Sequence, residues 1–176
     1  NLSQHVNFHN RSYFETRSIL ESFSDVSEAD GRIEQRAISF KVNLDKKDDP
    51  IFTRSGYLIS GIIKSAGFGG ERNYLKLDLN IQSYFPFKKQ SVIAFRLKTG
   101  KILGWDDVDN DFSFEKFYLG GSTSMRGWDV LRFKTRNLDD PLGETNRIMT
   151  NLEYRSPLYK SFGITLFIDG GVLEGD

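Results

Sequence analysis

The chain has 176 residues, in which 24 lysines and arginines balance 24 aspartates and glutamates. A formal net charge of zero argues against a nucleic-acid binder, which normally carries a basic excess or stripe. The absence of cysteine excludes disulfides, thiolate metal sites and cysteine nucleophiles, and the two histidines, His5 and His9, nearly exclude a multi-histidine metal centre. The length fits one domain or part of a larger one.

The sequence carries no signal for a membrane-spanning helix, because it has no apolar run of about 18 residues. Its first residues, NLSQHVNFHN, lack the basic and apolar regions of a signal peptide, so an exported protein would begin before this segment or be trimmed to it. Mean hydropathy of −0.44 is typical of a soluble protein. A transmembrane β-barrel gives a similar average, because its strands alternate polar and apolar residues.

Strict alternation of polar and apolar residues predicts β-strands along most of the chain. In chain order, strands are expected at roughly 5–20, at AISFKVNLD (37–45), at roughly 56–66, at NYLKLDLNIQSYF (73–85), at SVIAFRLKTG (91–100), at TNRIMTNLEYRSP (145–157) and at FGITLFIDGG (162–171). The clearest has Leu75, Leu77, Leu79 and Ile81 on one face. The first has a mixed pattern.

The segments between these strands predict an up-and-down antiparallel meander of about seven strands. Short turns are expected at YFPFKKQ and SPLYKS, and a proline-bearing turn is expected at DKKDDPIFTRSG. Polar loops are expected at 21–33, at 66–71 and at about 103–145. The fold class is therefore all-β, with most long connections on one side of the sheet.

No segment predicts a catalytic, metal or cofactor site. Asp107, Asp109 and Asp111 alternate as in a calcium loop, but Phe112 stands where its glycine belongs, so a solvated loop is expected. GFGG at 67–70 lacks the lysine and helix of a phosphate loop and is interpreted as a hairpin tip. Glu115 and Lys116 are expected to be solvated. Both histidines fall on one N-terminal strand, so no serine–histidine–acid triad is expected.

Two all-β architectures remain open. A soluble sandwich packs its apolar face against a second sheet, whereas a transmembrane barrel turns that face to lipid and its polar face to the lumen. Runs of about ten residues favour the tilted strands of a barrel over the five or six residues usual in soluble sheets. Aromatic residues near strand ends also favour a barrel, whose interfacial girdles they would form. They are Tyr57, Tyr74, Tyr84, Phe85, Phe87, Tyr154, Tyr159 and Phe162.

The segment FEKFYLGGSTSMRGWD (114–129) resembles the signature of the outer-membrane β-barrel assembly superfamily. That signature reads Phe-x-x-Gly-Gly, three or four residues, then hydrophobic–Arg–Gly–aromatic. Met125, Arg126, Gly127 and Trp128 match the final tetrad, although valine and phenylalanine or tyrosine are commoner at the outer two positions. DDPIFTRSGYLISG resembles an Asp-x-Pro turn of the superfamily, and NLEYRSPL and LFIDGGVL resemble its two strands after the motif. The resemblance covers nearly the whole chain.

The resemblance implies that the loop at about 103–145 folds back into the barrel lumen. It also implies that Arg126 pairs with acidic residues on the next two strands, here Glu153 and Asp169. The alternation agrees, because both acids fall on the polar face of their strands. A guanidinium is a planar fork that matches carboxylate oxygens. The alternative is that Arg126 is a surface cation in a flexible turn.

The other motif residues are expected to shape the loop. Gly120, Gly121 and Gly127 would allow tight backbone turns and a close approach to the barrel wall. Trp128 would supply packing area for the loop tip.

The resemblance implies a protein that is not an enzyme and needs no cofactor. The favoured function is an assembly factor of the BamA and TamA kind, which folds and inserts β-barrel proteins into the outer membrane. A polypeptide secretion transporter of the two-partner kind is the first alternative, and a soluble all-β binding module is the second. Implied partners are membrane lipid, unfolded β-barrel substrates and accessory assembly proteins, but not nucleic acid. The implied location is the outer membrane of a Gram-negative bacterium rather than of an organelle.

The resemblance also implies that residues 1–176 form part of a C-terminal barrel domain. They would cover roughly strands seven to thirteen of about sixteen. Neither the final strands nor a periplasmic repeat domain is recognised in the sequence. Alone, such a sheet would have two open edges and an apolar face, and is expected to aggregate in water.

Overall fold

The computed structural model describes residues 2–8, 12–23, 33–68, 73–88, 90–104, 115–133, 141, 143–159 and 162–175, with side chains from residue 37 onward. The expectations for Asp107, Asp109, Asp111, His9 and the second half of GFGG lie outside the described residues. No helix in the described part of the chain is long and apolar enough to cross a membrane.

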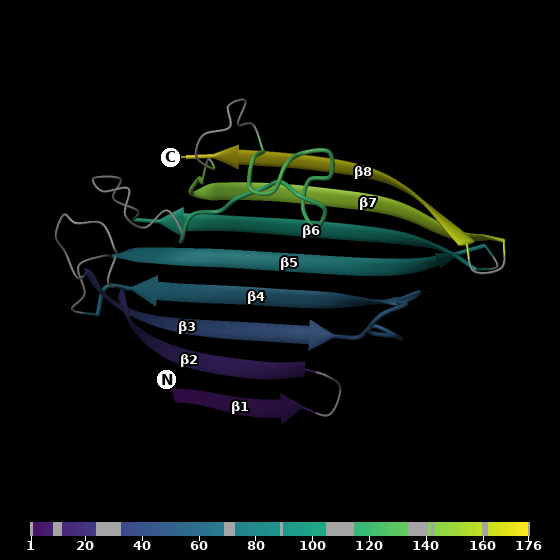
Figure 1. The fold of residues 1–176 in the computed structure, drawn as a ribbon. Coiled ribbons are helices and arrows are strands. Elements are labelled where there is room, and N and C mark those ends of the chain that lie inside the picture. Colours follow the sequence, from purple (N-terminus) through teal and green to yellow (C-terminus); the bar gives the residue numbers. More distant parts are fainter. Residues whose placement is uncertain are drawn as a thin grey trace.

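The described residues form one antiparallel sheet of eight strands in sequential order (Figure 1). The strands are β1 (Leu2–Phe8), β2 (Ser12–Phe23), β3 (Ile33–Asp45), β4 (Gly56–Ala66), β5 (Tyr74–Phe87), β6 (Ser91–Leu103), β7 (Asn146–Tyr159) and β8 (Phe162–Glu174). The predicted all-β meander is confirmed. The connections after β2, β4 and β6 lie at one end of the sheet, and those after β1, β3, β5 and β7 lie at the other (Figure 1).

Two strand predictions need correction. The strand expected at 5–20 is two antiparallel strands, β1 and β2, paired from Leu2↔Ser18 to Phe8↔Ser12. Its mixed pattern concealed the turn, and the sheet has eight strands rather than seven. The turns expected at YFPFKKQ and SPLYKS are largely strand, because β5 continues to Phe87 and β7 to Tyr159. Their prolines lie near strand ends, where a missing N–H costs least.

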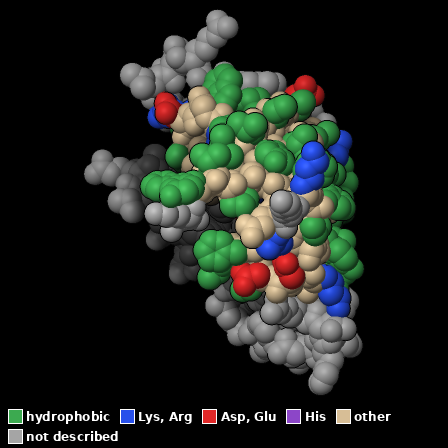
Figure 2. Space-filling model, turned by 90° about the vertical axis from the view of Figure 1, so that its right-hand side faces the viewer, with side chains coloured by type: hydrophobic (Ala, Val, Ile, Leu, Met, Phe, Trp, Pro, Cys, Tyr) green, Lys and Arg blue, Asp and Glu red, His purple; other side chains and the backbone are tan. Residues whose placement is uncertain are grey.

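Register divides the sheet into two faces. We call the face on which residues 115–133 lie the inner face, and the opposite one the outer face. The outer face carries the apolar half of each alternation, and Phe40, Ile63 and Leu152 on it are about half exposed, at 54%, 51% and 47%. Seen from the end that carries the β5–β6 and β7–β8 turns, hydrophobic side chains gather over the upper part and right-hand margin (Figure 2). No second sheet in the described residues covers this face, contrary to a sandwich.

The buried core lies on the inner face, between the sheet and residues 115–133. Its members are Ala37, Ala66, Tyr74, Ile102, Phe117, Leu119, Met125, Phe133, Met149 and Leu173. Tyr74, expected in an interfacial girdle, is only 5% exposed and belongs to this core. The connection after β6 therefore supplies much of the apolar material that covers the sheet.

The turn between β3 and β4 has the form that its Asp-x-Pro pattern predicts. The Asp48 carboxylate accepts hydrogen bonds from the backbone N–H groups of Asp49, Arg54 and Ser55. These bonds, first from Ser55 and then from Arg54, lower the pKa of Asp48 below its ordinary value. Gly56 closes the turn with φ of +104°, and a Cβ there would lie 2.1 Å from the Lys46 carbonyl oxygen. Only glycine fits this position.

Candidate functional site

Residues 115–133, which we call the motif loop, lie across β6, β7 and β8 (Figure 1). Their glycines give the loop its shape: Gly120, Gly121 and Gly127 have φ of +119°, +92° and +87°. Such angles are easy for glycine and costly for other residues. The Gly121 N–H donates to the Trp128 carbonyl oxygen at 3.0 Å, which closes the tip on itself.

The motif loop approaches the sheet closely because of a glycine in the sheet, Gly171, and not because of the glycines of the motif. A Cβ on Gly120 would meet the Asp129 carbonyl oxygen of the same loop at 2.2 Å, and one on Gly127 would meet nothing within 4 Å. A Cβ on Gly171 of β8 would instead lie 3.0 Å from the Met125 sulfur. Gly171 thus makes room for Met125, which is 5% exposed.

Trp128 packs within the loop. It is 43% exposed, and its ring meets Phe133 edge-on at a centroid distance of 5.1 Å. The loop tip is therefore buried mainly through Met125 and Leu119, which lie under it.

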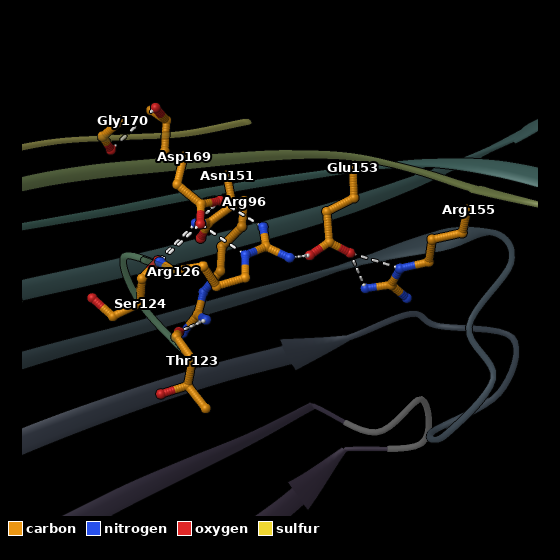
Figure 3. A network of polar contacts seen from close by, with 10 residues as sticks. Arg96, Thr123, Ser124, Arg126, Asn151, Glu153, Arg155, Asp169 and Gly170 are labelled. Carbon is orange, nitrogen blue, oxygen red and sulfur yellow. Dashed lines mark hydrogen bonds and ion pairs between the residues drawn. The ribbon is translucent and has the colours of Figure 1, made fainter. Parts of the chain in front are cut away.

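Arg126 joins the loop tip to two strands (Figure 3). Its Nε donates to Asp169 Oδ2 at 2.7 Å, and its terminal nitrogens contact Asp169 Oδ1 at 2.5 Å and Glu153 Oε1 at 2.6 Å. The Arg126 backbone N–H also donates to Asp169 Oδ2, at 3.0 Å. The structure thus brings together the three residues that the family resemblance pairs, with Asp169 in the bidentate geometry.

Neighbouring side chains hold the two carboxylates in place. Asn151 Nδ2 donates to Asp169 Oδ1 and to the Ser124 carbonyl oxygen, both at 2.8 Å. Arg155 Nε donates to the second oxygen of Glu153 at 2.7 Å. On the remaining side, the Phe167 ring lies 3.6 Å from the Arg126 guanidinium carbon. Phe167 extends the site beyond the residues predicted from sequence. It alternates with the apolar residues Leu166 and Ile168 and so shares a face with Asp169.

The site is electrostatic. The side chains of Arg126, Glu153 and Asp169 are 20%, 17% and 5% exposed, so water screens these contacts less than it would a surface pair. The hydrogen bond to Asp169 raises the pKa of Arg126, against a lowering by burial and with a further rise from Glu153. The guanidinium therefore stays charged. No cluster of three metal-ligating side chains occurs among the described residues.

A polar cavity of about 240 Å³ lies beside this network, between the loop tip and β5 to β7. Arg96 borders it and reaches the loop, where its guanidinium donates to the Thr123 carbonyl oxygen at 3.0 Å. A third strand, β6, therefore also holds the tip by a polar contact.

Glu115 was expected to be solvated, but the structure buries it. It is 7% exposed and contacts Lys64 Nζ at 2.5 Å and Lys76 Nζ at 3.2 Å. Lys76 belongs to the polar face predicted for 73–85, whereas no face was predicted for the strand that carries Lys64. Nothing local in the sequence shows that the loop returns to either lysine. Lys116 is half-buried rather than solvated.

These features define a class: an antiparallel sheet with an apolar outer face, whose long connection is held against the inner face by an arginine and two carboxylates. Residues 1–175 match the Omp85 superfamily domain, and the chain belongs to that superfamily. The chain is similar to the "Outer membrane protein assembly factor BamA" of Neorickettsia risticii, with 28% identity over 146 residues, 79% of this chain and 19% of that protein. It is also similar to the "Sorting and assembly machinery component 50 homolog A" of Xenopus laevis, with 28% identity over 119 residues, 67% of this chain and 25% of that protein.

A solved structure has the same fold. It is the crystal structure of BamA from Haemophilus ducreyi lacking POTRA domains 1–3, with a TM-score of 0.66 and 15% identity over 93% of this chain and 37% of that one. The sheet is therefore a fragment of a β-barrel. The chain spans 19% and 25% of the lengths of the two curated relatives named above.

Proposed function

We propose that the protein is an outer-membrane assembly factor that folds and inserts β-barrel proteins. The observation that carries the proposal is the Arg126 network, in which a loop on the inner face is held to β7 and β8 through Glu153 and Asp169. It occurs in a chain of the Omp85 superfamily whose relatives include proteins named for outer-membrane assembly and for sorting and assembly. The proposed location is the outer membrane of a Gram-negative bacterium; the relative from an animal makes an organelle membrane the other possibility.

The proposed barrel is larger than this sheet. Residues 1–176 would supply eight of about sixteen strands, as part of a C-terminal barrel domain. The partners would be membrane lipid along the outer face, unfolded β-barrel proteins as substrates, and accessory assembly proteins.

The proposed mechanism needs no covalent step and no cofactor. An open strand edge presents unpaired N–H and C=O groups, and an incoming strand that pairs with them exchanges water for backbone hydrogen bonds. The motif loop would support this process by bracing the inner wall of the barrel.

The test is reconstitution of the full-length protein in lipid vesicles, followed by addition of a urea-unfolded β-barrel substrate. We expect faster folding of the substrate than in empty vesicles, and slower folding with Arg126→Ala. Lys46→Gln, in the β3–β4 turn, is the control and should match the parent.

Two other results would overturn the proposal. If an added polypeptide crosses into the vesicle interior without becoming membrane-integrated, the protein is a secretion transporter. If the full-length protein is monomeric in detergent-free buffer and does not bind vesicles, it is a soluble binding module.

A further inference from the structure

The motif loop touches the wall at a second place, about ten residues before Arg126. Here Glu115 is enclosed by two strands that do not contribute to the Arg126 network. Lys64 of β4 contacts Glu115 Oε1 at 2.5 Å, and Lys76 of β5 contacts Oε2 at 3.2 Å. Lys76 also donates to the backbone carbonyl oxygen of Glu115, at 2.5 Å. The side chain and the backbone of one residue are thus fixed together.

An aromatic ring extends this second contact. Phe117 is 3% exposed, and its ring centroid lies 4.9 Å from Lys76 Nζ and 4.4 Å from the Arg147 guanidinium carbon. Arg147 in turn contacts Asp78 Oδ1 at 2.6 Å. Each cation near the ring therefore has an acidic partner as well, so that the group is not a bare cluster of like charges.

The wall is shaped to receive this ring. A Cβ added to Gly100 of β6 would lie 2.4 Å from the Phe117 ring, which is nearer than any real contact allows. Phe117 also pairs with Glu144 on the returning leg of the connection, through two backbone hydrogen bonds of 2.8 Å and 3.0 Å. The start of the loop is therefore bound to the sheet and to the end of the same connection.

We propose that Glu115 is a positioning residue, whose ion pairs with Lys64 and Lys76 set where the motif loop leaves the wall and so where Arg126 meets Glu153 and Asp169. We call the group of Glu115, Phe117, Lys64 and Lys76 the base anchor, and that of Arg126, Glu153 and Asp169 the tip anchor. The inference concerns loop position and goes beyond the proposed assembly function, because it holds whatever the barrel acts on.

Loop position is measured as a distance between two spin labels in the full-length protein in nanodiscs. The 176 residues contain no cysteine, so labels go on cysteines introduced at Val130 in the loop and Leu158 near the end of β7, with any cysteine elsewhere replaced. Both side chains are exposed, at 70% and 72%. Pulsed electron paramagnetic resonance then gives the distance distribution for the parent and for Glu115→Gln.

We expect one narrow distance population in the parent and an additional longer, broader population in Glu115→Gln. The matched control is Glu144→Gln, which also removes a carboxylate from this connection but leaves the backbone pairing with Phe117 intact. It should keep the parent distribution. Lys64→Gln should produce a smaller shift in the same direction, because Lys76 still pairs with Glu115. Adding Lys64→Gln to Glu115→Gln should change the distribution little further, because the carboxylate that Lys64 contacts is already gone.

Thermal unfolding of the same samples separates positioning from general stabilisation. If Glu115→Gln lowers the unfolding midpoint but keeps the parent distance distribution, Glu115 only adds stability and the inference is overturned. If Glu115→Gln does not fold, Lys64→Gln takes its place. A lowered unfolding midpoint with the parent distance distribution in Lys64→Gln would then overturn the inference. Assembly activity is measured in a separate experiment. An inactive parent protein would refute the proposed function but would leave the conclusion from the label distances unchanged.

Discussion

The tip anchor and the base anchor use opposite arrangements of charge. At the tip, the loop supplies one cation, Arg126, and the strands supply two carboxylates. At the base, the loop supplies one carboxylate, Glu115, and the strands supply two cations. Each anchor also has a phenylalanine ring against a guanidinium: Phe167 at the tip and Phe117 at the base.

This inversion gives the loop one docking register. A loop docked in the reverse sense would place Glu115 near Glu153 and Asp169, and Arg126 near Lys64 and Lys76. Like charges in a partly dry site cost free energy, so the wrong position is penalised while the right one is stabilised. Two anchors of opposite charge arrangement therefore specify the position of the loop better than two anchors of the same charge arrangement would.

Loss of the tip cation should have the largest effect. Arg126→Ala leaves Glu153 and Asp169 without their guanidinium, and removing one partner of such a pair costs about 3 kcal/mol. Faster hydrogen exchange of residues 117–131, read by mass spectrometry, checks this. Arg126→Lys should recover only part of the protection, because an ammonium cannot form the bidentate pair. Full protection in Arg126→Ala would contradict a tip anchor.

The fit of the base anchor should be the next most sensitive feature. Gly100→Ala forces the Phe117 ring to move, and overpacking of this kind costs about 1–3 kcal/mol. We expect faster exchange around residues 115–119 with the barrel intact. Gly61→Ala is the matched control, since its Cβ would be 4.0 Å from the nearest atom. Equal exchange in both variants would show that the ring is not held.

Acid should weaken the base anchor. Burial raises the pKa of Glu115, but the hydrogen bond from Lys64 and the charge of Lys76 outweigh it, and the pKa lies below its ordinary value of 4.5. The contribution of the carboxylate is therefore complete above pH 4.5 and is lost as pH falls through the lowered value. Asp78 and Arg147 are the other charged groups nearby.

The matching measurement is the label distance between Val130 and Leu158 in Arg126→Ala from pH 6 to about pH 3. That background removes the tip anchor, so the remaining change with pH reports on the base. We expect a shift to longer distances in the acid range. The Arg126→Ala/Glu115→Gln double variant should show no such shift, and a shift there would assign the effect to other groups.

The ring at the tip should give the smallest effect. Phe167→Leu removes the aromatic ring that lies against the Arg126 guanidinium but keeps both carboxylates. A cation–π contact of this kind contributes about 0.5–1 kcal/mol at a partly exposed site. Slightly faster exchange near residue 126 is the expected result. If Phe167→Leu lost as much protection from hydrogen exchange as Arg126→Ala, then Phe167, rather than the ion pairs, would hold the loop tip.

Much of the fold follows from local pattern. Alternation placed β3 to β8 and assigned Glu153 and Asp169 to one face, because neighbouring residues on a strand point to opposite sides. The pattern failed for β1 and β2, where it is mixed, and at the ends of β5 and β7, where proline suggested a turn. The motif pointed to Arg126 and its partners only through resemblance to a family.

The sequence by itself determined the all-β meander and the polar and apolar faces, because these depend on residues within one strand. Only the tertiary structure decided that Glu115 is buried between Lys64 and Lys76, and that Gly100 and Gly171 make room for Phe117 and Met125. Lys64 and Glu115 are 51 residues apart, so no local pattern relates them. The environment of a loop side chain is set by the surface on which the loop folds.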